Sequence, residues 1–164
     1  MSTATPKTSP RVSFASITSN NLGTVRRLNS VLFPIRYSEK FYRDILLPEA
    51  EDFCKLVYYN DIPVGTICCR LENKNDQTHL YLMTMGVLAP YRSRGLGAQS
   101  LELVLKAAKD HVKPKIKKIY LHVQVSNDGA KAFYERHGFT EVEIHKDYYR
   151  KIEPHDAWVL EKRF

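Results

Sequence analysis

Leu80 to Ala98 reads LYLMTMGVLAPYRSRGLGA, and this stretch decides the fold. An apolar strand leads into a turn that holds Gly95 and Gly97, and an amphipathic helix follows. The start of a helix presents unpaired backbone N–H groups and the positive end of the helix dipole, and glycine lets a ligand approach the backbone closely. Arg92 and Arg94 add positive charge. We interpret the turn as a cradle for an anion such as a pyrophosphate, with a plain surface turn as the alternative.

The spacing of the glycines distinguishes this turn from two other phosphate-binding loops. The P-loop pattern Gly-x-x-x-x-Gly-Lys-Ser/Thr does not occur in the sequence, and only the first two glycines of the dinucleotide pattern Gly-x-Gly-x-x-Gly are present. The string Arg-x-x-Gly-x-Gly after an apolar strand instead resembles the coenzyme A pyrophosphate loop of the GCN5-related N-acetyltransferase (GNAT) superfamily. A second stretch resembles a later helix and strand of the same superfamily: Asn127, followed by Ala130-x-x-Phe133-Tyr134-x-x-x-Gly138-Phe139.

Length and composition indicate one globular domain. The chain has 164 residues, of which 43% are hydrophobic and 26% charged, as in ordinary globular domains. Residues 1–10 are rich in Ser, Thr and Pro, so we predict a disordered tail there and a single domain over residues 11–164. No apolar run approaches the roughly 20 residues that cross a bilayer, so we expect no membrane partner.

The net charge indicates which class of partner to expect, and the cysteine content indicates the redox compartment. The net charge of +7 suits polyanions such as coenzyme A phosphates or ribosomal RNA, or it reflects a solvated basic surface. No nucleic-acid-binding motif accompanies the charge, so we expect no sequence-specific recognition of nucleic acid. Cys54, Cys68 and Cys69 lack a Cys-x-x-Cys spacing, which favours buried free thiols in a reducing compartment.

Hydrophobic periodicity predicts the order β-α-α-β-β-β-α-β-α-β-β, an α/β arrangement with a mixed sheet. Strands are expected over residues 12–18, 53–59, 63–71, 78–87, 116–125, 139–144 and 157–161, and helices near residues 25–32, 38–45, 95–111 and 130–137. Residues 72–77 are interpreted as a polar connection and residues 147–154 as a polar loop with aromatic residues. The GNAT resemblance implies that the sheet is mostly antiparallel, splayed between its central strands, and flanked by helices.

Further strings extend the resemblance over nearly the whole chain after the first ten residues. They are Phe33-Pro34-Ile35-x-Tyr37, Tyr81-Leu82-Met83-Thr84, Leu88-Ala89-Pro90-Tyr91-Arg92, Tyr120-Leu121-His122-Val123-Gln124 and Tyr148-Tyr149-x-x-Ile152-x-Pro154. Together these strings resemble the NatE type of N-terminal acetyltransferase.

This resemblance implies acetyl-CoA as the donor, without a metal. As acceptor it implies the α-amine of a protein N-terminus, preferably a retained methionine followed by a hydrophobic or otherwise permissive residue. It further implies docking beside the auxiliary and catalytic subunits of the NatA complex on the ribosome. The expected location is the cytoplasm, with the nucleus as a second place.

Tyr81 and His122 are the candidate catalytic residues. Each carries a proton-transferring side chain within an apolar strand, and both would face one cleft if the two strands are neighbours. A half-buried strand tyrosine and a core histidine are the alternatives. An α-amine has a pKa of about 7.7–8.0 and a lysine amine about 10.4, so a modest base acting through a water suffices for the former. We expect no buried carboxylate beside the pair, which favours α-amines as substrates.

The coenzyme-binding residues are expected along the central strand, in the glycine turn and in the late helix. They are Met85, Gly86, Val87, Arg92, Ser93, Arg94, Gly95, Leu96, Gly97, Ala98, Asn127 and Tyr134. A bulge permitted by Gly86 would free a backbone N–H to polarise the thioester carbonyl. The resemblance implies that Tyr134 donates to the leaving sulfur, and we expect Asn127 to bond the pantetheine arm.

The acceptor pocket is expected between two loops that are rich in rigid apolar rings, whose hydroxyls could bond a peptide backbone. The expected residues are Phe33, Pro34, Ile35, Tyr37, Met83, Tyr148, Tyr149 and Ile152. The alternative is that these rings only plug surface turns. Two other functions stay open at this point: a lysine Nε-acetyltransferase on the same fold, and a weakly active acetyl-CoA-binding subunit of a ribosome-associated complex.

Overall fold

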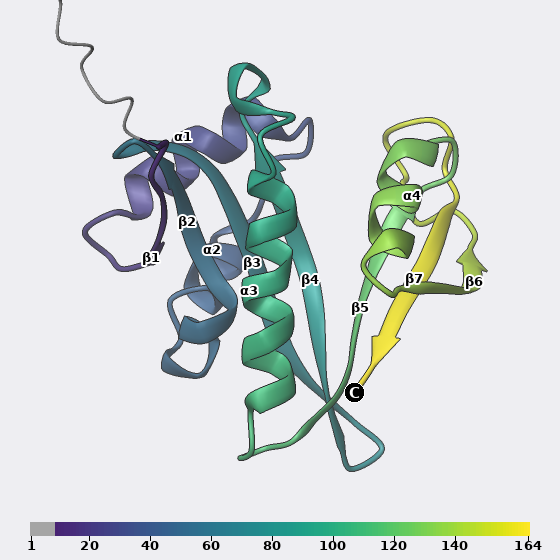
Figure 1. Ribbon diagram of the computed structural model, residues 1–164. Coiled ribbons are helices and arrows are strands. Elements are labelled where there is room, and N and C mark those ends of the chain that lie inside the picture. The colour runs from purple at the N-terminus through teal and green to yellow at the C-terminus, as the bar shows by residue number, and fades with distance from the viewer. Residues whose placement is uncertain (1–8) are drawn as a thin grey trace, which may run out of the picture.

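The computed structural model describes residues 9–164 and shows one seven-stranded sheet with helices on both faces (Figure 1). The strands are β1 (Val12–Ser16), β2 (Cys54–Tyr59), β3 (Ile62–Lys74), β4 (Gln77–Val87), β5 (Ile116–Gln124), β6 (Thr140–His145) and β7 (Ala157–Arg163). The helices are α1 (Leu22–Leu32), α2 (Glu39–Asp44), α3 (Leu96–Asp110) and α4 (Asp128–Arg136), with short 3₁₀ turns η1 (Pro48–Phe53) and η2 (Ala89–Tyr91). The predicted element order is confirmed. The predicted disordered tail over residues 1–10 lies almost wholly outside the described residues and stays a prediction.

The strand order in space is β1-β2-β3-β4-β5-β7-β6, and every pairing is antiparallel except that of β4 with β5. Two tight turns produce the meander from β2 to β4. Asn60 and Asp61 join β2 to β3 with φ angles of 49° and 66°, and Asn75 and Asp76 join β3 to β4 with φ angles of 51° and 60°. Asn and Asp tolerate this left-handed backbone, which suits a two-residue hairpin.

The second hairpin corrects one prediction about the chain. Residues 72–77 were expected to form a polar connection, but β3 continues to Lys74 and β4 begins at Gln77. The polar residues of this segment were misleading because they lie within the strand and face other polar groups across the sheet. Glu72, for example, is opposite His79 in the register of β3 and β4.

The two faces of the sheet carry two separate parts of the core. Leu101, Val104 and Leu105 of α3 and Tyr134 of α4 pack on one face, together with apolar residues of β4, β5 and β7. The helices α1 and α2 bury Val25, Leu28, Phe41 and Ile45 on the opposite face. The i, i+3, i+4 spacing in these helices places the apolar residues on one stripe. The three cysteines are buried and free, as expected.

The central strands separate partway along their length. β4 and β5 pair in parallel register from Thr78↔Ile116 to Tyr81↔Tyr120, and no further pairs follow although both strands continue. Figure 1 shows the two strands diverging from this point, while β3 remains paired with β4 as far as Val87. The edge of β4 that faces β5 is therefore open beyond Tyr81, which is the splayed sheet that the resemblance implied.

The bulge in β4 lies at a different residue from the one expected. Cys68 is opposite Thr84 and Cys69 is opposite Leu82, so Met83 is the extra residue on β4. The expected bulge at Gly86 is wrong. Gly86 is instead needed for close packing, because a Cβ atom there would lie 3.0 Å from Cζ of Phe33.

None of the helices within residues 9–164 has the length and hydrophobicity needed to cross a membrane.

The close approach of β3 to β4 gives a prediction for stability. A Cβ atom at Gly65 would lie 2.6 Å from the carbonyl oxygen of Gly86, which is backbone of the paired strand. Because neither strand can move without losing pairing, we expect Gly65→Ala to lower the free energy of unfolding by about 1–3 kcal/mol in urea titrations.

The matched control for this substitution is Gly129→Ala in α4. A Cβ atom at Gly129 meets nothing within 4 Å, and alanine favours a helix over glycine by roughly 0.5–1 kcal/mol. Equal destabilisation by the two substitutions would contradict the packing argument.

Candidate active site

The glycine turn at the start of α3 is built to accept an anion. Gly95 has a left-handed φ of 78° and precedes α3 without a side-chain cap, so the first N–H groups of the helix are left for an outside partner. A Cβ atom at Gly97 would meet nothing nearer than 3.8 Å, which leaves room over the turn. The predicted sequence Arg92 to Ala98 therefore has the expected local structure.

The two arginines of the turn are held at its rim. Arg92 donates from Nε to the carbonyl oxygen of Val87 at 3.0 Å. Arg94 donates from Nη1 to the Tyr59 hydroxyl at 3.1 Å, and its guanidinium lies over the rings of Tyr59 and Tyr91. These contacts fix the positive charges beside the helix start, where they favour an anion.

Tyr134 and Asn127 lie on the other side of the divergence between β4 and β5. Tyr134 is only 8% exposed, and its hydroxyl makes no hydrogen bond within residues 9–164. Burial raises its pKa well above the usual value, so the hydroxyl stays protonated and can donate. Asn127 accepts a bond from the Ala130 N–H and thereby caps α4.

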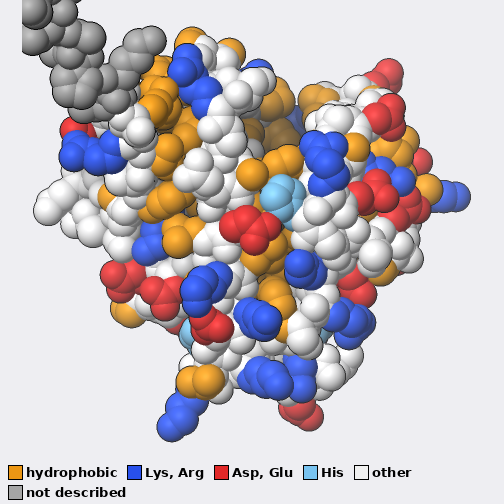
Figure 2. Space-filling model, viewed as in Figure 1, with side chains coloured by type: hydrophobic (Ala, Val, Ile, Leu, Met, Phe, Trp, Pro, Cys, Tyr) orange, Lys and Arg blue, Asp and Glu red, His pale blue; other side chains and the backbone are white. Residues whose placement is uncertain are grey.

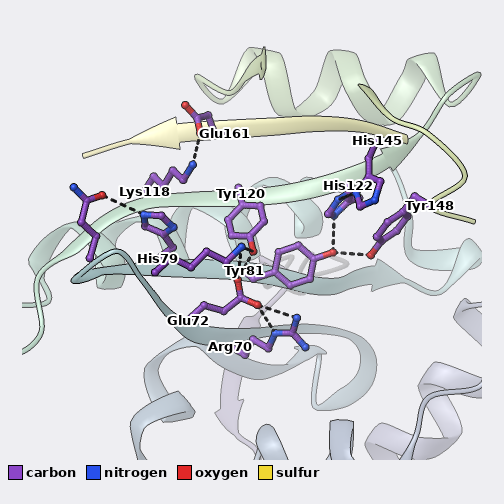
Figure 3. A network of polar contacts seen from close by, with 12 residues as sticks. Arg70, Glu72, His79, Tyr81, Lys118, Tyr120, His122, His145, Tyr148 and Glu161 are labelled. Atoms are coloured by element: carbon purple, nitrogen blue, oxygen red, sulfur yellow. Dashed lines mark hydrogen bonds and ion pairs between the residues drawn. The ribbon is translucent and has the colours of Figure 1, made fainter. Parts of the chain in front are cut away.

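Tyr81 and His122 meet where β4 and β5 separate, as the sequence predicted. The Tyr81 hydroxyl is 2.8 Å from Nδ1 of His122 and 2.8 Å from the Tyr148 hydroxyl (Figure 3). The Tyr148 ring stacks on the His122 imidazole with ring centres 3.9 Å apart and planes within 4°. Tyr148, which was expected to bind the acceptor, is thus also a direct neighbour of both candidate catalytic groups.

Burial keeps this pair uncharged at neutral pH. Burial is the main cause that raises the pKa of Tyr81 far above its usual value. Burial, reinforced by the nearby His145, lowers the pKa of His122 to about 4. His122 is therefore a neutral imidazole that can accept a proton, and Tyr81 is a hydroxyl that conducts a proton rather than a phenolate that holds a charge.

A second polar group, formed by Tyr120 and Glu72, lies beside Tyr81 and was not predicted from the sequence. Tyr120 packs against Tyr81 with ring centres 4.8 Å apart and bonds to Glu72, which also pairs with Arg70 (Figure 3). Glu72 is half-buried and bonds Tyr120 rather than Tyr81 or His122, so no described bond joins a carboxylate to the pair itself. Burial would raise the pKa of Glu72, but bonds from Tyr120 and Arg70 lower it, so the carboxylate is ionised and already occupied. The alternation of residues along β3 could have indicated that the strand continues through Glu72, but the polar residues from 72 to 77 suggested a loop instead.

His145 is a further neighbour that sequence reasoning missed. Its Nδ1 atom lies 3.1 Å from Nε2 of His122, although β7 separates their strands in the sheet. A histidine at the end of an exposed strand carries no distinguishing pattern, so only the strand order reveals the contact.

The first aromatic loop forms one wall of a hollow of about 490 Å³. Its lining includes Phe33, Pro34, Ile35, Arg36 and Tyr37 from the loop, with the remainder, most of it polar, from α1 and α2. Tyr37 stacks on Phe41 with ring centres 4.6 Å apart. These four predicted acceptor residues lie together, as expected.

The remaining predicted acceptor residues do not line this hollow. Met83 packs against the core on the α1 and α2 side. Burial is the main cause that raises the pKa of Tyr37 to about 12, and the phenols of Tyr149 and Tyr148 in the second aromatic loop add to it. The N–H of Tyr149 donates to the carbonyl of His155 at 2.8 Å and closes the loop that carries Ile152. Ile152 is half-buried, and its role stays a prediction.

Charge on the surface is mixed. Figure 2 shows many Lys and Arg side chains on the face that carries α3 and α4, with Asp and Glu among them, and apolar side chains recessed between the two halves. Among residues 9–164, no group of three or more His, Cys, Asp or Glu side chains is arranged to hold a metal ion.

Comparison with known proteins agrees with this geometry. The chain matches the acetyltransferase (GNAT) family over residues 22–139. It is 46% identical to N-alpha-acetyltransferase 50 of Danio rerio over 93% of this chain and 88% of that protein. It is 44% identical to the probable N-acetyltransferase san of Drosophila melanogaster, over 92% and 80% of the two chains. The structure resembles Arabidopsis thaliana Naa50 in complex with the bisubstrate analogue CoA-Ac-MVNAL, with a TM-score of 0.84, 45% identity, and coverage of 93% and 99%.

The low pKa of His122 can be measured by nuclear magnetic resonance. We expect its imidazole to titrate near pH 4, against an ordinary value of about 6.5. The unfolded chain would take up this proton at higher pH than the folded chain, so this group lowers stability as the pH falls from about 6.5 to about 4.

Replacing His145 tests the cause of this shift. In His145→Asn the repulsion from a second imidazolium is lost, so the pKa of His122 should rise but stay below its ordinary value, because burial is the larger cause. Lys146→Ala, at the neighbouring exposed residue, should leave it unchanged. A His122 that titrates at its ordinary value in the unaltered protein would contradict the buried site.

Proposed function

The chain belongs to the acetyltransferase (GNAT) family, and from this premise we propose that it transfers the acetyl group of acetyl-CoA to the α-amine of protein N-termini. The observation that carries the proposal is the neutral Tyr81–His122 pair at the point where β4 and β5 separate. The same chain carries a turn suited to a pyrophosphate and a hollow whose lining includes Phe33, Pro34, Ile35 and Tyr37.

The residues present fit acetyl-CoA. The uncapped start of α3 at Gly95 to Ala98 and the rim arginines would hold the pyrophosphate, and Asn127 at the start of α4 would bond the pantetheine arm. Beyond Tyr81 the backbone of β4 is not paired with β5, which leaves the edge along Met85, Gly86 and Val87 open, although the Val87 carbonyl accepts a bond from Arg92. When bound, the donor supplies an acetyl thioester, and a backbone N–H and the Tyr134 hydroxyl would bond its oxygen and its sulfur.

The remaining chemistry belongs to the protein's own side chains. An α-amine with a pKa of about 7.7–8.0 is partly neutral at physiological pH. It therefore needs positioning and a route for one proton more than it needs a strong base. Tyr81 supplies an oxygen that can accept a bond from the amine or from a water, and His122 behind it accepts the proton.

The acceptor is proposed to be a short extended peptide that begins with a retained methionine. Phe33, Pro34, Ile35 and Tyr37 give the hollow one apolar wall, which suits a methionine or hydrophobic second side chain, whereas the rest of its lining is largely polar and includes the ion pair of Arg26 with Glu39. Phe33 also lies against the backbone of Gly86, so the acceptor wall adjoins the strand on which the donor is expected. The relative from Arabidopsis thaliana was solved with an analogue that joins CoA to the peptide MVNAL, which agrees with this class of acceptor.

The proposal extends to partners and location. We propose that the protein docks beside the auxiliary and catalytic subunits of the NatA complex on the ribosome, in the cytoplasm and also in the nucleus. The sequence resemblance to NatE-type enzymes supports this, and the net charge of +7 suits a location near ribosomal RNA.

The acceptor class is tested with three peptides and radiolabelled acetyl-CoA. The first begins Met-Val and contains an internal lysine, the second is the same peptide with a blocked N-terminus, and the third is the free peptide with lysine replaced by arginine. We expect label on the first and third peptides only, because no partner around Tyr81 and His122 is placed to deprotonate a lysine. Label on the blocked peptide would indicate a lysine acetyltransferase, and no label on any would favour a binding subunit.

The role of Tyr81 is tested by Tyr81→Phe, which keeps the buried ring and removes only the hydroxyl. We expect kcat/KM for the Met-Val peptide to fall about 100-fold, as for loss of an acid–base group. The KM for acetyl-CoA should hardly change, because the Tyr81 hydroxyl bonds His122 and Tyr148 and no residue of the glycine turn. Tyr58→Phe, on the other side of the sheet's centre in β2, is the control and should keep full activity. Equal rates for Tyr81→Phe and the unaltered enzyme would remove the hydroxyl from the mechanism.

A further inference from the structure

His122 has no nitrogen left to face the substrate directly. Its Nδ1 atom is bonded to the Tyr81 hydroxyl and its Nε2 atom to His145, while the Tyr148 ring covers one face of the imidazole (Figure 3). A proton that reaches His122 from the reacting amine must therefore arrive through the Tyr81 oxygen. A proton that leaves His122 outward must pass to His145.

We propose that His145 is a positioning and relay residue that carries the reaction's proton from His122 to solvent. The inference rests on the proposed acetyl transfer and adds a residue to it. The Tyr81 oxygen, His122 and His145 form a continuous line of contacts of 2.8 Å and 3.1 Å that runs from the buried site to an exposed side chain.

The register of the sheet explains how His145 reaches this place. β7 lies between β5 and β6, and His145 is opposite Ala157, which is opposite Gln124 two residues beyond His122. Ala157 carries only a methyl group, so β7 leaves space for the two imidazoles to meet over it. Figure 3 shows both rings on the same side of the sheet as Tyr81 and Tyr148.

The proton step balances along this line. The step starts from the arrangement in which Tyr148 donates to the Tyr81 oxygen, Tyr81 donates to Nδ1 of His122, and the Nε2–H of His122 donates to Nδ1 of His145; the contact distances allow each of these bonds. As the amine nitrogen forms its bond to the acetyl carbon, the carbon–sulfur bond breaks and its electron pair leaves with the sulfur as the coenzyme thiolate. The nitrogen loses one proton to the Tyr81 oxygen. Tyr81 passes its own proton to Nδ1 of His122, and His122 passes its Nε2 proton to His145.

The positive charge produced by the proton transfer ends on His145, which is exposed to solvent. His145 becomes an imidazolium whose Nε2–H can release a proton to solvent, because the side chain is exposed. The two buried groups are neutral before and after the step. This matters because burial disfavours a charge on either of them.

Two substitutions separate a relay from a merely structural contact. His145→Asn keeps an acceptor near the former Nδ1 position but cannot take a proton, and His145→Ala removes both properties. We expect kcat for the Met-Val peptide to fall about tenfold in both variants, a modest share of the usual acid–base contribution. Imidazole added to the buffer should restore most of the rate of His145→Ala, and Lys146→Ala should match the unaltered enzyme.

Each outcome of this experiment decides the proposal. Full activity in His145→Asn, or no rescue of His145→Ala by imidazole, would show that the contact only orients His122 and would overturn the relay. Full activity in His145→Ala would overturn it as well. If the unaltered enzyme fails to label the free peptide, the proposed function fails and the relay fails with it, whereas an active enzyme with unaffected variants refutes the relay alone.

Discussion

The loss of pairing between β4 and β5 after Tyr81↔Tyr120 is the constraint on which the site depends. A continuous sheet would satisfy the backbone of β4 on both edges and would close the space between α3 and α4. Because the two strands separate, the turn at Gly95 and the side chain of Tyr134 can face a shared ligand from opposite sides. The same separation brings Tyr81 and His122 to the end of the paired segment, where the sheet no longer covers them.

The site also joins the two faces of the sheet. Tyr134 and α3 belong to the core on one face, whereas Tyr37, Phe41 and the aromatic hollow belong to the other. Donor and acceptor are thus expected to arrive from different sides and to meet at the open edge of β4. No ionised group touches the Tyr81 hydroxyl among its described hydrogen-bond partners, since Glu72 is held by Tyr120 and Arg70. Such a site suits an amine that needs little help to lose its proton.

Much of the fold could be predicted from local patterns. The apolar faces of helices, the alternation in strands and the Asn-Asp turn depend only on residues that are close together in the sequence. The glycine turn was predictable for the same reason, whereas the meeting of Tyr81 with His122 also required that β4 and β5 be neighbours in the sheet. The errors have a common cause. Glu72 and Tyr120, the bulge at Met83, and the contact of His145 with His122 depend on which strands lie side by side and in which register. Residue patterns along one strand do not contain that information.

The short pairing between the central strands has a mechanical consequence. Only the four pairs from Thr78 to Tyr81 join β4 to β5 within the sheet, and His137 at the end of α4 hydrogen-bonds Glu102 of α3 at 2.7 Å. A donor molecule gripped by the α3 turn and by α4 would act as a brace between the N-terminal and C-terminal halves. Binding to the folded state alone adds to its stability by mass action. The free energy of unfolding would thereby rise with the concentration of the donor, and the two halves would come apart more readily in its absence.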